Sequence, residues 1–141
     1  AFTDFSDSNQ RHEVSLEGQE RIWSSPYLIV DFLPSLYYEQ NTEHDTPYYN
    51  PIKMFDIVPA FEASHLLWRS YENSWEQIFS AGVGASWQKH GTDVVTQLGY
   101  GQRISWNDVI DAGATLRWEK RPYDGDREHN LYVEFDMTFR F

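Results

Sequence analysis

Two short clusters in the sequence combine residue types that can do chemistry. Glu43-His44-Asp45 has two carboxylates beside an imidazole, which could bind a metal ion, and Ser64-His65 has a hydroxyl beside a possible general base. A metal site would need a second pair of ligands at a suitable spacing, and a hydrolytic triad would need a placed acid. The sequence offers neither. We therefore expect a solvated loop at Glu43-His44-Asp45, and no catalytic residue, metal site or cofactor.

A larger chemical feature is a series of carboxylates on the polar side of apolar–polar alternating stretches. The chain has 22 acidic and 11 basic residues and a formal net charge of −11, which argues against nucleic acid as a partner. A face of this kind attracts cations and suits a cationic or partly cationic substrate. Its expected carboxylates are Glu13, Glu17, Asp31, Glu39, Asp56, Glu62, Glu76, Asp111, Glu119, Glu134 and Asp136, and its expected arginines are Arg21, Arg103, Arg117 and Arg140.

The elements that present these carboxylates are strands, and the clearest strand is at the end of the chain. From Leu131 to Phe141 every odd-numbered residue is apolar, whereas the even-numbered ones are Tyr, Glu, Asp, Thr and Arg. A strand separates two such sets onto opposite faces because its side-chain period is two. About ten residues is also the length that a tilted membrane-spanning strand needs. The final Phe141 extends the apolar face, as is recurrent in outer-membrane barrels.

The same alternation predicts further strands along the chain. They cover a short segment near 2–5 and the ranges 13–22, 28–39, 55–64, 76–88, 94–104 and 110–119. Pro34 and Pro59 lie inside two of them and lack an N–H, which predicts a bulge or a local edge at each. The adjacent apolar residues Leu66 and Leu67 break the alternation, which predicts a bulge near His65.

Composition favours a β-barrel in a membrane. No stretch approaches the roughly 18 uninterrupted apolar residues of a transmembrane helix, whereas a barrel distributes its lipid-facing residues by alternation. Trp, Tyr and Phe together make 17% of the chain, an aromatic content typical of the girdles at membrane interfaces. Cysteine is absent, which excludes disulfides and thiolate chemistry.

The expected connections alternate between short and long. The segments 22–27, 70–75 and 105–108 are short and carry Trp or Tyr, whereas 6–12, 40–53, 88–93 and 121–129 are longer and polar. Outer-membrane barrels have short periplasmic turns and longer external loops. We therefore expect the C-terminus in the periplasm and, by the parity of the strands, both chain ends there. The expected membrane girdle consists of Trp23, Tyr27, Tyr71, Trp75, Trp106 and Phe141.

Three alternatives remain open at this point. A soluble up-and-down barrel would show the same alternation with its apolar face inside. A small closed outer-membrane barrel could have a structural or adhesive role, or could be an enzyme. Eight closed strands leave an interior just wide enough to be filled by side chains, and unpaired carboxylates are costly there. The excess of acidic, Gly and Ser residues on the polar face therefore favours a slice of a wider, water-filled pore.

Several motifs in fixed order carry a specific resemblance to a known family. The chain resembles the C-terminal porin region of the PgaA family, the poly-β-1,6-N-acetyl-D-glucosamine export porins of biofilm-forming bacteria. The resemblance covers nearly the whole chain. The motifs are RIWSS at 21–25, TPYYNP at 46–51, YGQR at 100–103, WND at 106–108, DAGA at 111–114, RPYDG at 121–125 and Arg127-Glu128.

The resemblance implies an all-β, antiparallel transmembrane barrel of the bacterial outer membrane. Proteins of this family have a sixteen-stranded barrel after periplasmic tetratricopeptide repeats, so residues 1–141 would be about eight strands of the C-terminal porin domain, without the repeats. The implied activity is export of a partly de-N-acetylated polysaccharide, with outer-membrane lipid and periplasmic polysaccharide-processing machinery as partners. On the polar face, Tyr37 and Tyr132 could stack on sugar rings as the polymer passes.

Overall fold

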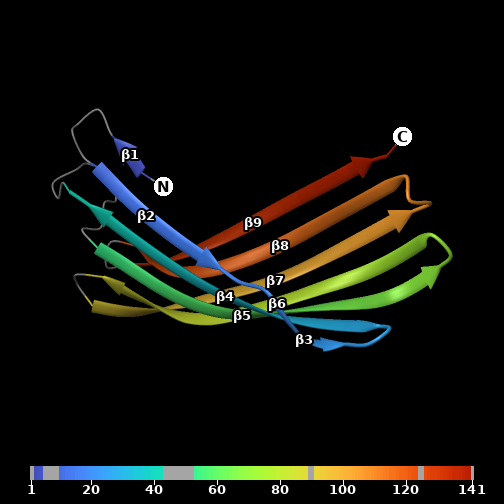
Figure 1. The fold of residues 1–141 in the computed structure, drawn as a ribbon, viewed down its shortest axis with the longest axis horizontal. Helices are drawn as coiled ribbons and strands as arrows, with labels where there is room; N and C mark the ends of the chain where they lie inside the picture. The colour runs from blue at the N-terminus through green and yellow to red at the C-terminus, as the bar shows by residue number, and fades with distance from the viewer. Residues whose placement is uncertain (1, 5–9, 43–52, 89–90, 124–125, 141) are drawn as a thin grey trace.

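The computed structural model describes residues 2–4, 10–42, 53–88, 91–123 and 126–140, which build one antiparallel sheet (Figure 1). Apolar–polar alternation produces this arrangement because each strand can then turn one kind of side chain to each face. The strands are β1 (Phe2–Asp4), β2 (Gln10–Glu17), β3 (Glu20–Ser24), β4 (Leu28–Asn41), β5 (Lys53–Ser70), β6 (Asn73–Gln88), β7 (Gly91–Trp106), β8 (Ile110–Tyr123) and β9 (Asp126–Phe139).

The sheet is an open trough in which each strand pairs with its neighbours in the sequence. The order is β1-β2-β4-β5-β6-β7-β8-β9, and β3 continues β2 along the same edge of β4. The sheet is therefore eight strands wide, as predicted. Within the described residues β1 and β9 do not pair with each other, so the sheet does not close into a small barrel. No helix of the described part is long and apolar enough to span a membrane.

One face of the sheet is apolar and exposed. Its aromatic side chains contact each other across neighbouring strands, with ring centroids 5.2 Å apart for Phe32 and Phe61 and 5.0 Å apart for Phe79 and Tyr100. Large apolar side chains remain exposed to an extent that a water-soluble surface rarely shows. Examples are Val14, Leu16, Phe61, Val83, Val94, Leu98, Leu131, Val133, Phe135 and Met137.

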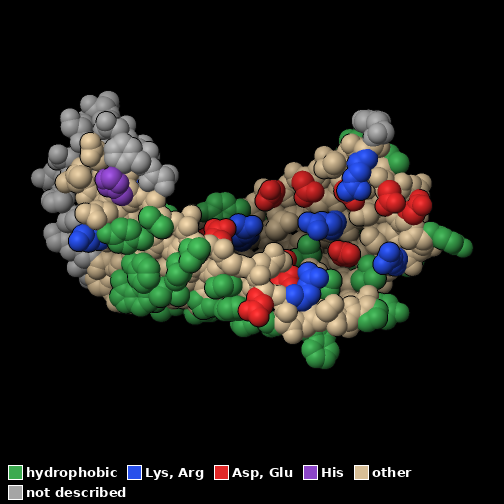
Figure 2. Space-filling model, in the orientation of Figure 1, with side chains coloured by type: hydrophobic (Ala, Val, Ile, Leu, Met, Phe, Trp, Pro, Cys, Tyr) green, Lys and Arg blue, Asp and Glu red, His purple; other side chains and the backbone are tan. Residues whose placement is uncertain are grey.

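The opposite, polar face is the concave one. Arg121 of β8 reaches Asp56 of β5 with an Nη1–Oδ2 distance of 3.2 Å, although β6 and β7 lie between these strands. Such a contact requires the sheet to curve toward this face. Figure 2 shows charged side chains gathered in the hollow of the molecule. The predicted polar interior is therefore confirmed, and the soluble alternative with an apolar interior is wrong.

The two prolines inside strands lie directly opposite each other, Pro34 on β4 and Pro59 on β5. Pro34 faces the interruption between β2 and β3, where the N–H of Gly18 donates to the Pro34 carbonyl over 3.0 Å. Pro59 lies where pairing between β5 and β6 is interrupted. Each proline thus has a local edge on the side where its N–H is missing. The predicted bulge near His65 is confirmed by a register shift between Leu66 and Trp68.

The strands extend further than the alternation predicted. The expected long polar connections at 88–93 and 121–129 are wrong, because β6 ends at Gln88, β7 begins at Gly91, β8 ends at Tyr123 and β9 begins at Asp126. Strand pairing continues beyond the residues whose outer face has to be apolar. The apolar–polar alternation in the sequence therefore ends before the hydrogen-bond ladder does. The longer separations are those between β1 and β2 and between β4 and β5.

The short turns lie together at the other end of the sheet. Tyr71 has a φ of 53°, and Asn107 and Asp108 have φ values of 52° and 53°. Left-handed conformations of this kind close tight turns, and Asn and Asp adopt them more readily than most residues. These turns join β5 to β6 and β7 to β8. We call this end of the sheet the short-turn end. We call the opposite end the long-connection end, because the long connections from β1 to β2 and from β4 to β5 lie there.

The two ends of the described chain lie at opposite ends of the sheet (Figure 1). Phe2–Asp4 pairs with Gln10–His12 at the long-connection end, whereas β9 finishes at Phe139 beside Ile110 at the short-turn end. The prediction that both chain ends lie on one side is therefore wrong. β1 runs in the expected direction, but it spans only 3 residues, all next to its connection to β2.

Candidate lumen wall

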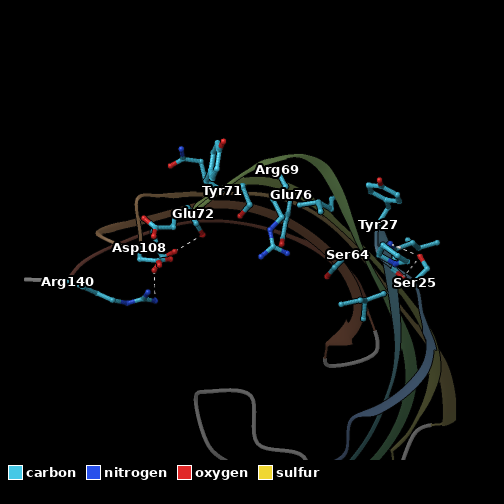
Figure 3. Close-up of a pocket in the computed structure, with 17 residues that line it drawn as sticks. Ser25, Tyr27, Ser64, Arg69, Tyr71, Glu72, Glu76, Asp108 and Arg140 are labelled. Carbon is cyan, nitrogen blue, oxygen red and sulfur yellow. Dashed lines mark hydrogen bonds and ion pairs between the residues drawn. The ribbon is translucent and has the colours of Figure 1, made fainter.

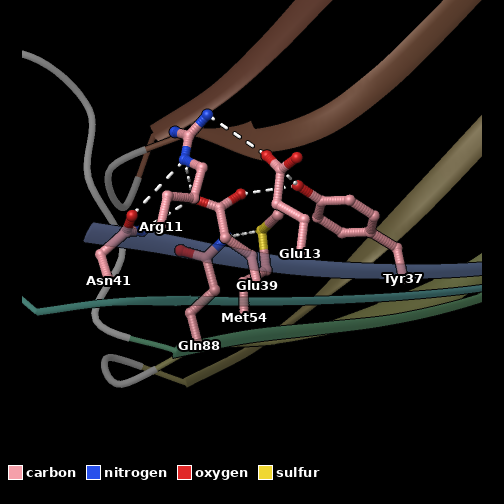
Figure 4. A network of polar contacts seen from close by, with 7 residues as sticks. All are labelled: Arg11, Glu13, Tyr37, Glu39, Asn41, Met54 and Gln88. Atoms are coloured by element: carbon pink, nitrogen blue, oxygen red, sulfur yellow. Dashed lines mark hydrogen bonds and ion pairs between the residues drawn. The ribbon is translucent and has the colours of Figure 1, made fainter. Parts of the chain in front are cut away.

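A network of ion pairs and hydrogen bonds covers the concave face at the long-connection end (Figure 4). Glu13 and Glu39 lie directly opposite each other on β2 and β4, so their like charges would repel without a cation. Arg11 supplies that cation, with distances of 3.3 Å to Glu13 and 3.1 Å to Glu39. The Tyr37 hydroxyl is 2.8 Å from Glu39, and the Asn41 amide donates to Glu39 over 2.8 Å.

A second arginine bridges two carboxylates on β5 and β8, also toward the long-connection end. Arg121 Nε is 2.6 Å from Glu119 Oε1, and its Nη1 is 3.2 Å from Asp56 Oδ2. Asp56 is 2% exposed and lies opposite Ser86, which is 1% exposed. A buried carboxylate of this kind requires a cation partner. Arg121 therefore neutralises Asp56 across the curved sheet.

Two further ion pairs lie toward the short-turn end. The Arg21 guanidinium contacts Asp31 with an Nε–Oδ1 distance of 3.0 Å, and the Gln19 amide donates to the same carboxylate over 2.9 Å. Arg140 contacts Asp111 at 2.6 Å. The region around Asp111 is hollowed, with a cavity of about 540 Å³. Figure 3 shows Ser64, Glu76 and Arg140 around this cavity on the inner side of the arc.

All the predicted carboxylates lie on described strands, but they fall into two groups. Those that pair with an arginine are Glu13, Asp31, Glu39, Asp56, Asp111 and Glu119. Those that form no ion pair with any described residue are Glu17, Glu62, Glu76, Glu134 and Asp136. Of the predicted arginines on this face, Arg103 and Arg117 likewise form no ion pair with a described residue, and Arg103 lies directly opposite Glu76.

The sequence reasoning missed Arg11 and Arg121 as residues of this face, because it assigned both to polar connections. Each lies on a strand that extends past the apolar stretch, Arg11 on β2 and Arg121 on β8. The spacing offered a signal, since Arg11 is two residues from Glu13 and Arg121 is two residues from Glu119. Residues two apart in a strand share a face.

The two tyrosines expected to meet sugar rings have different surroundings. Tyr37 is half-buried, and its hydroxyl donates to Glu39 and lies 3.2 Å from Glu13. Tyr132 is 51% exposed and lies opposite Arg117 near the open edge of the sheet. β9 is the edge strand of this open sheet, so the exposure of Tyr132 includes the side where a neighbouring strand is absent.

The expected aromatic girdle lies at the short-turn end. Trp23 is 60% exposed, Trp75 is 44% exposed and Trp106 is 51% exposed. Tyr27 and Tyr71 lie in the turns themselves, and Tyr71 is 96% exposed. Phe141 lies outside the described residues. The Trp75 indole and the Tyr100 hydroxyl both hydrogen-bond the amide of Gln102, so their polar atoms have partners.

The clusters considered for metal or hydrolytic chemistry do not assemble a site in the described residues. Glu43-His44-Asp45 lies outside them. His65 Nδ1 is 3.0 Å from the amide of Gln77, with no carboxylate completing a triad. No group of three or more His, Cys, Asp or Glu residues in the described segments is arranged to hold a metal ion.

Comparisons with known proteins agree with this geometry. The chain is 99% identical over 142 aligned residues to the poly-beta-1,6-N-acetyl-D-glucosamine export proteins of Escherichia coli strain K12 and of Escherichia coli O157:H7. The alignment covers 100% of this chain and 18% of each of those proteins. A solved structure titled "Bacterial polysaccharide outer membrane secretin" matches with a TM-score of 0.94 and 98% identity, over 99% of this chain and 49% of that one.

The extent of these matches agrees with an open trough. The chain spans less than a fifth of the curated relatives and about half of the solved chain, so a wall of this shape is one part of a larger protein. The relatives carry the name of an export protein and not of an enzyme. Residues 1–141 match the family described as "PgaA membrane beta barrel domain", and the chain therefore belongs to that family.

Proposed function

We propose that this chain forms about half of the wall of an outer-membrane pore that exports poly-β-1,6-N-acetyl-D-glucosamine. The proposal rests on the names of its near-identical relatives, an export protein and an outer-membrane secretin for polysaccharide. Segments of the protein beyond these residues supply the other half of the wall, because the sheet is open and covers 49% of the solved chain.

The observation that carries the proposal is the distribution of side chains over the trough. The convex face exposes large apolar residues such as Phe135 and Val83, whereas charged residues gather on the concave face (Figure 2). A membrane barrel with an aqueous lumen requires this distribution, and a soluble barrel requires the reverse.

The concave face offers many weak contacts to a passing polymer. The carboxylates Glu62, Glu76, Glu134 and Asp136, which form no ion pair in the described part of the chain, attract the ammonium groups of de-N-acetylated sugar units. Tyr132 stacks on sugar rings from the wall. Conduction needs binding that is favourable enough for entry and weak enough for release, and dispersed contacts satisfy both conditions.

The orientation of the wall follows from its two ends. The short-turn end, with Trp75 and Trp106, faces the periplasm, and the long-connection end faces outward. The polymer enters from periplasmic polysaccharide-processing machinery.

The test is conductance of the full-length K12 relative in planar bilayers, with partly de-N-acetylated glucosamine oligomers added to one side. We expect cation-selective openings that the oligomers block in a concentration-dependent way. Dextran oligomers of equal length are the matched control, and we expect weaker block because they carry no amine. A bilayer that stays silent, or anion-selective openings that the oligomers leave unchanged, would contradict the proposed function.

A further inference from the structure

The middle of the concave face is hollowed by a cavity of about 630 Å³, a size typical of small-molecule sites. We call it the wall pocket. Its floor is formed by Leu33, Val58 and Ala60, on the adjacent strands β4 and β5. Its rim includes Glu17, Gln97 and Arg117, on β2, β7 and β8. The pocket therefore spans strands from β2 to β8 on the concave face.

The floor of the wall pocket is apolar, and Met54, Ile78 and Val95 are further apolar residues on the same face of the sheet. Leu33 and Ala60 lie directly opposite each other and are half-buried, while Val58 beside them is 3% exposed. Apolar groups of a ligand can pack here, and their removal from water stabilises binding.

The charges that line the wall pocket are balanced. Glu17 and Asp56 are matched by Arg117 and Arg121. Asp56 is 2% exposed and contacts Arg121 through Oδ2, whereas its Oδ1 has no hydrogen-bond partner. A balanced rim favours a neutral ligand, because a free ammonium gains from Glu17 no more than it loses to Arg117.

The remaining polar groups suit an amide ligand. Gln97 lies on the rim with its side chain half-buried, and a carboxamide can both donate to and accept from another amide. An acetamido group combines such an amide with a methyl group. With the amide at Gln97, the methyl would lie over the apolar floor at Val58 and Ala60.

We propose that the wall pocket is a subsite for a neutral N-acetylated sugar unit, separate from the unpaired carboxylates that attract free amines. The inference rests on the proposed export function, because the N-acetyl sugar comes from the name of the relatives. The wall then carries two kinds of contact, a neutral one in the wall pocket and charged ones at Glu62, Glu76, Glu134 and Asp136. In a polymer with both kinds of unit, each kind of contact binds only some of the units. The polymer is then bound weakly at each point, which favours its movement through the pore.

The experiment compares two blockers in the full-length K12 relative in planar bilayers. One is a fully N-acetylated β-1,6-glucosamine pentamer and the other is its fully de-N-acetylated counterpart. Ala60→Leu fills the floor, and Gln97→Ala removes the amide of the rim. The matched control is Asn130→Ala, which removes an amide from the neighbouring wall outside the pocket.

We expect Ala60→Leu and Gln97→Ala each to weaken block by the N-acetylated pentamer at least five-fold. Block by the de-N-acetylated pentamer should change less than two-fold, and Asn130→Ala should affect neither. If Ala60→Leu fails to assemble, Gln97→Ala provides the test alone. Equal effects on both pentamers, or none, would overturn the subsite while the export function stands. An unmodified pore that neither pentamer blocks would instead overturn the export function.

Discussion

Arg11 and Arg121 each lie between two carboxylates of the concave face. Without them, Glu13 and Glu39 would be adjacent like charges, and Asp56 would be a buried carboxylate with no cation. These arginines compensate carboxylates of the concave face that cannot reach bulk water. In the proposed pore, the negative charge available to a substrate resides on the carboxylates without an arginine partner.

Replacing Arg121 by methionine tests this role. We expect Arg121→Met to destabilise the full-length K12 relative by about 3 kcal/mol, because Asp56 stays buried without its partner. The measurement is the urea midpoint of unfolding in phospholipid vesicles. The control is Arg103→Met, since Arg103 is exposed and makes no ion pair with described residues. A similar loss in both variants would show that the Asp56 contact contributes little.

The strands are adapted to the curvature of the trough where β5 and β6 come close together. A Cβ added to Gly84 would lie 2.0 Å from the Ile57 carbonyl oxygen and 2.7 Å from Val58 Cα. Only glycine fits there, next to the interrupted pairing at Pro59. This close approach lets the sheet bend without losing the ladder on either side.

Gly84→Ala should therefore destabilise the sheet by about 1–3 kcal/mol, as other overpacked sites do. The matched control is Gly101→Ala, where the nearest atom is the Thr115 hydroxyl at 3.1 Å, which can rotate away. Heat-induced unfolding, followed by gel mobility of unheated samples, gives the order of stability. Equal stability of the two variants would mean that the strands can separate at Gly84 at little cost.

The two faces of β9 allow the orientation of the wall to be tested. An arginine is placed on one face and, in a second variant, at the neighbouring position on the other face. Phe135 is 79% exposed on the apolar face, and Glu134 lies on the concave face. Phe135→Arg should cost about 2–4 kcal/mol if it lies near the bilayer midplane. Glu134→Arg should change stability by less than about 0.5 kcal/mol. Vesicle unfolding measures both, and the opposite order would mean that lipid contacts the polar face.

Across the trough as a whole, paired and unpaired carboxylates should contribute differently to ion selectivity. Neutralising Glu62, Glu76 and Asp136 together as Gln, Gln and Asn should lower the cation selectivity of the pore, because none of them is compensated among the described residues. The measurement is the reversal potential in a KCl gradient. Its shift should shrink at high salt, where exposed charges are screened.

The control for that experiment replaces an ion pair by neutral residues. Arg21→Gln with Asp31→Asn removes one charge of each sign from the same face. We expect an unchanged reversal potential. A change as large as that of the triple substitution would mean that selectivity does not follow the net charge of the wall.

The sequence by itself determined the class of fold, the width of the sheet and the face of the side chains within the alternating stretches. Alternation with period two is a local property, so Leu131 to Phe139 could be assigned to faces without any knowledge of their neighbours. The bulge near His65 followed for the same reason, because a pair of adjacent apolar residues breaks that period.

The tertiary structure decided which charges compensate each other and where the wall is hollow. The contact between Asp56 and Arg121 joins residues 65 positions apart and exists because the sheet curves, which no local pattern encodes. The same curvature brings Leu33, Ala60, Gln97 and Arg117 around one cavity. Strand ends were also settled by pairing, since hydrogen bonds extend past the membrane-facing residues whose hydropathy marks a strand in the sequence.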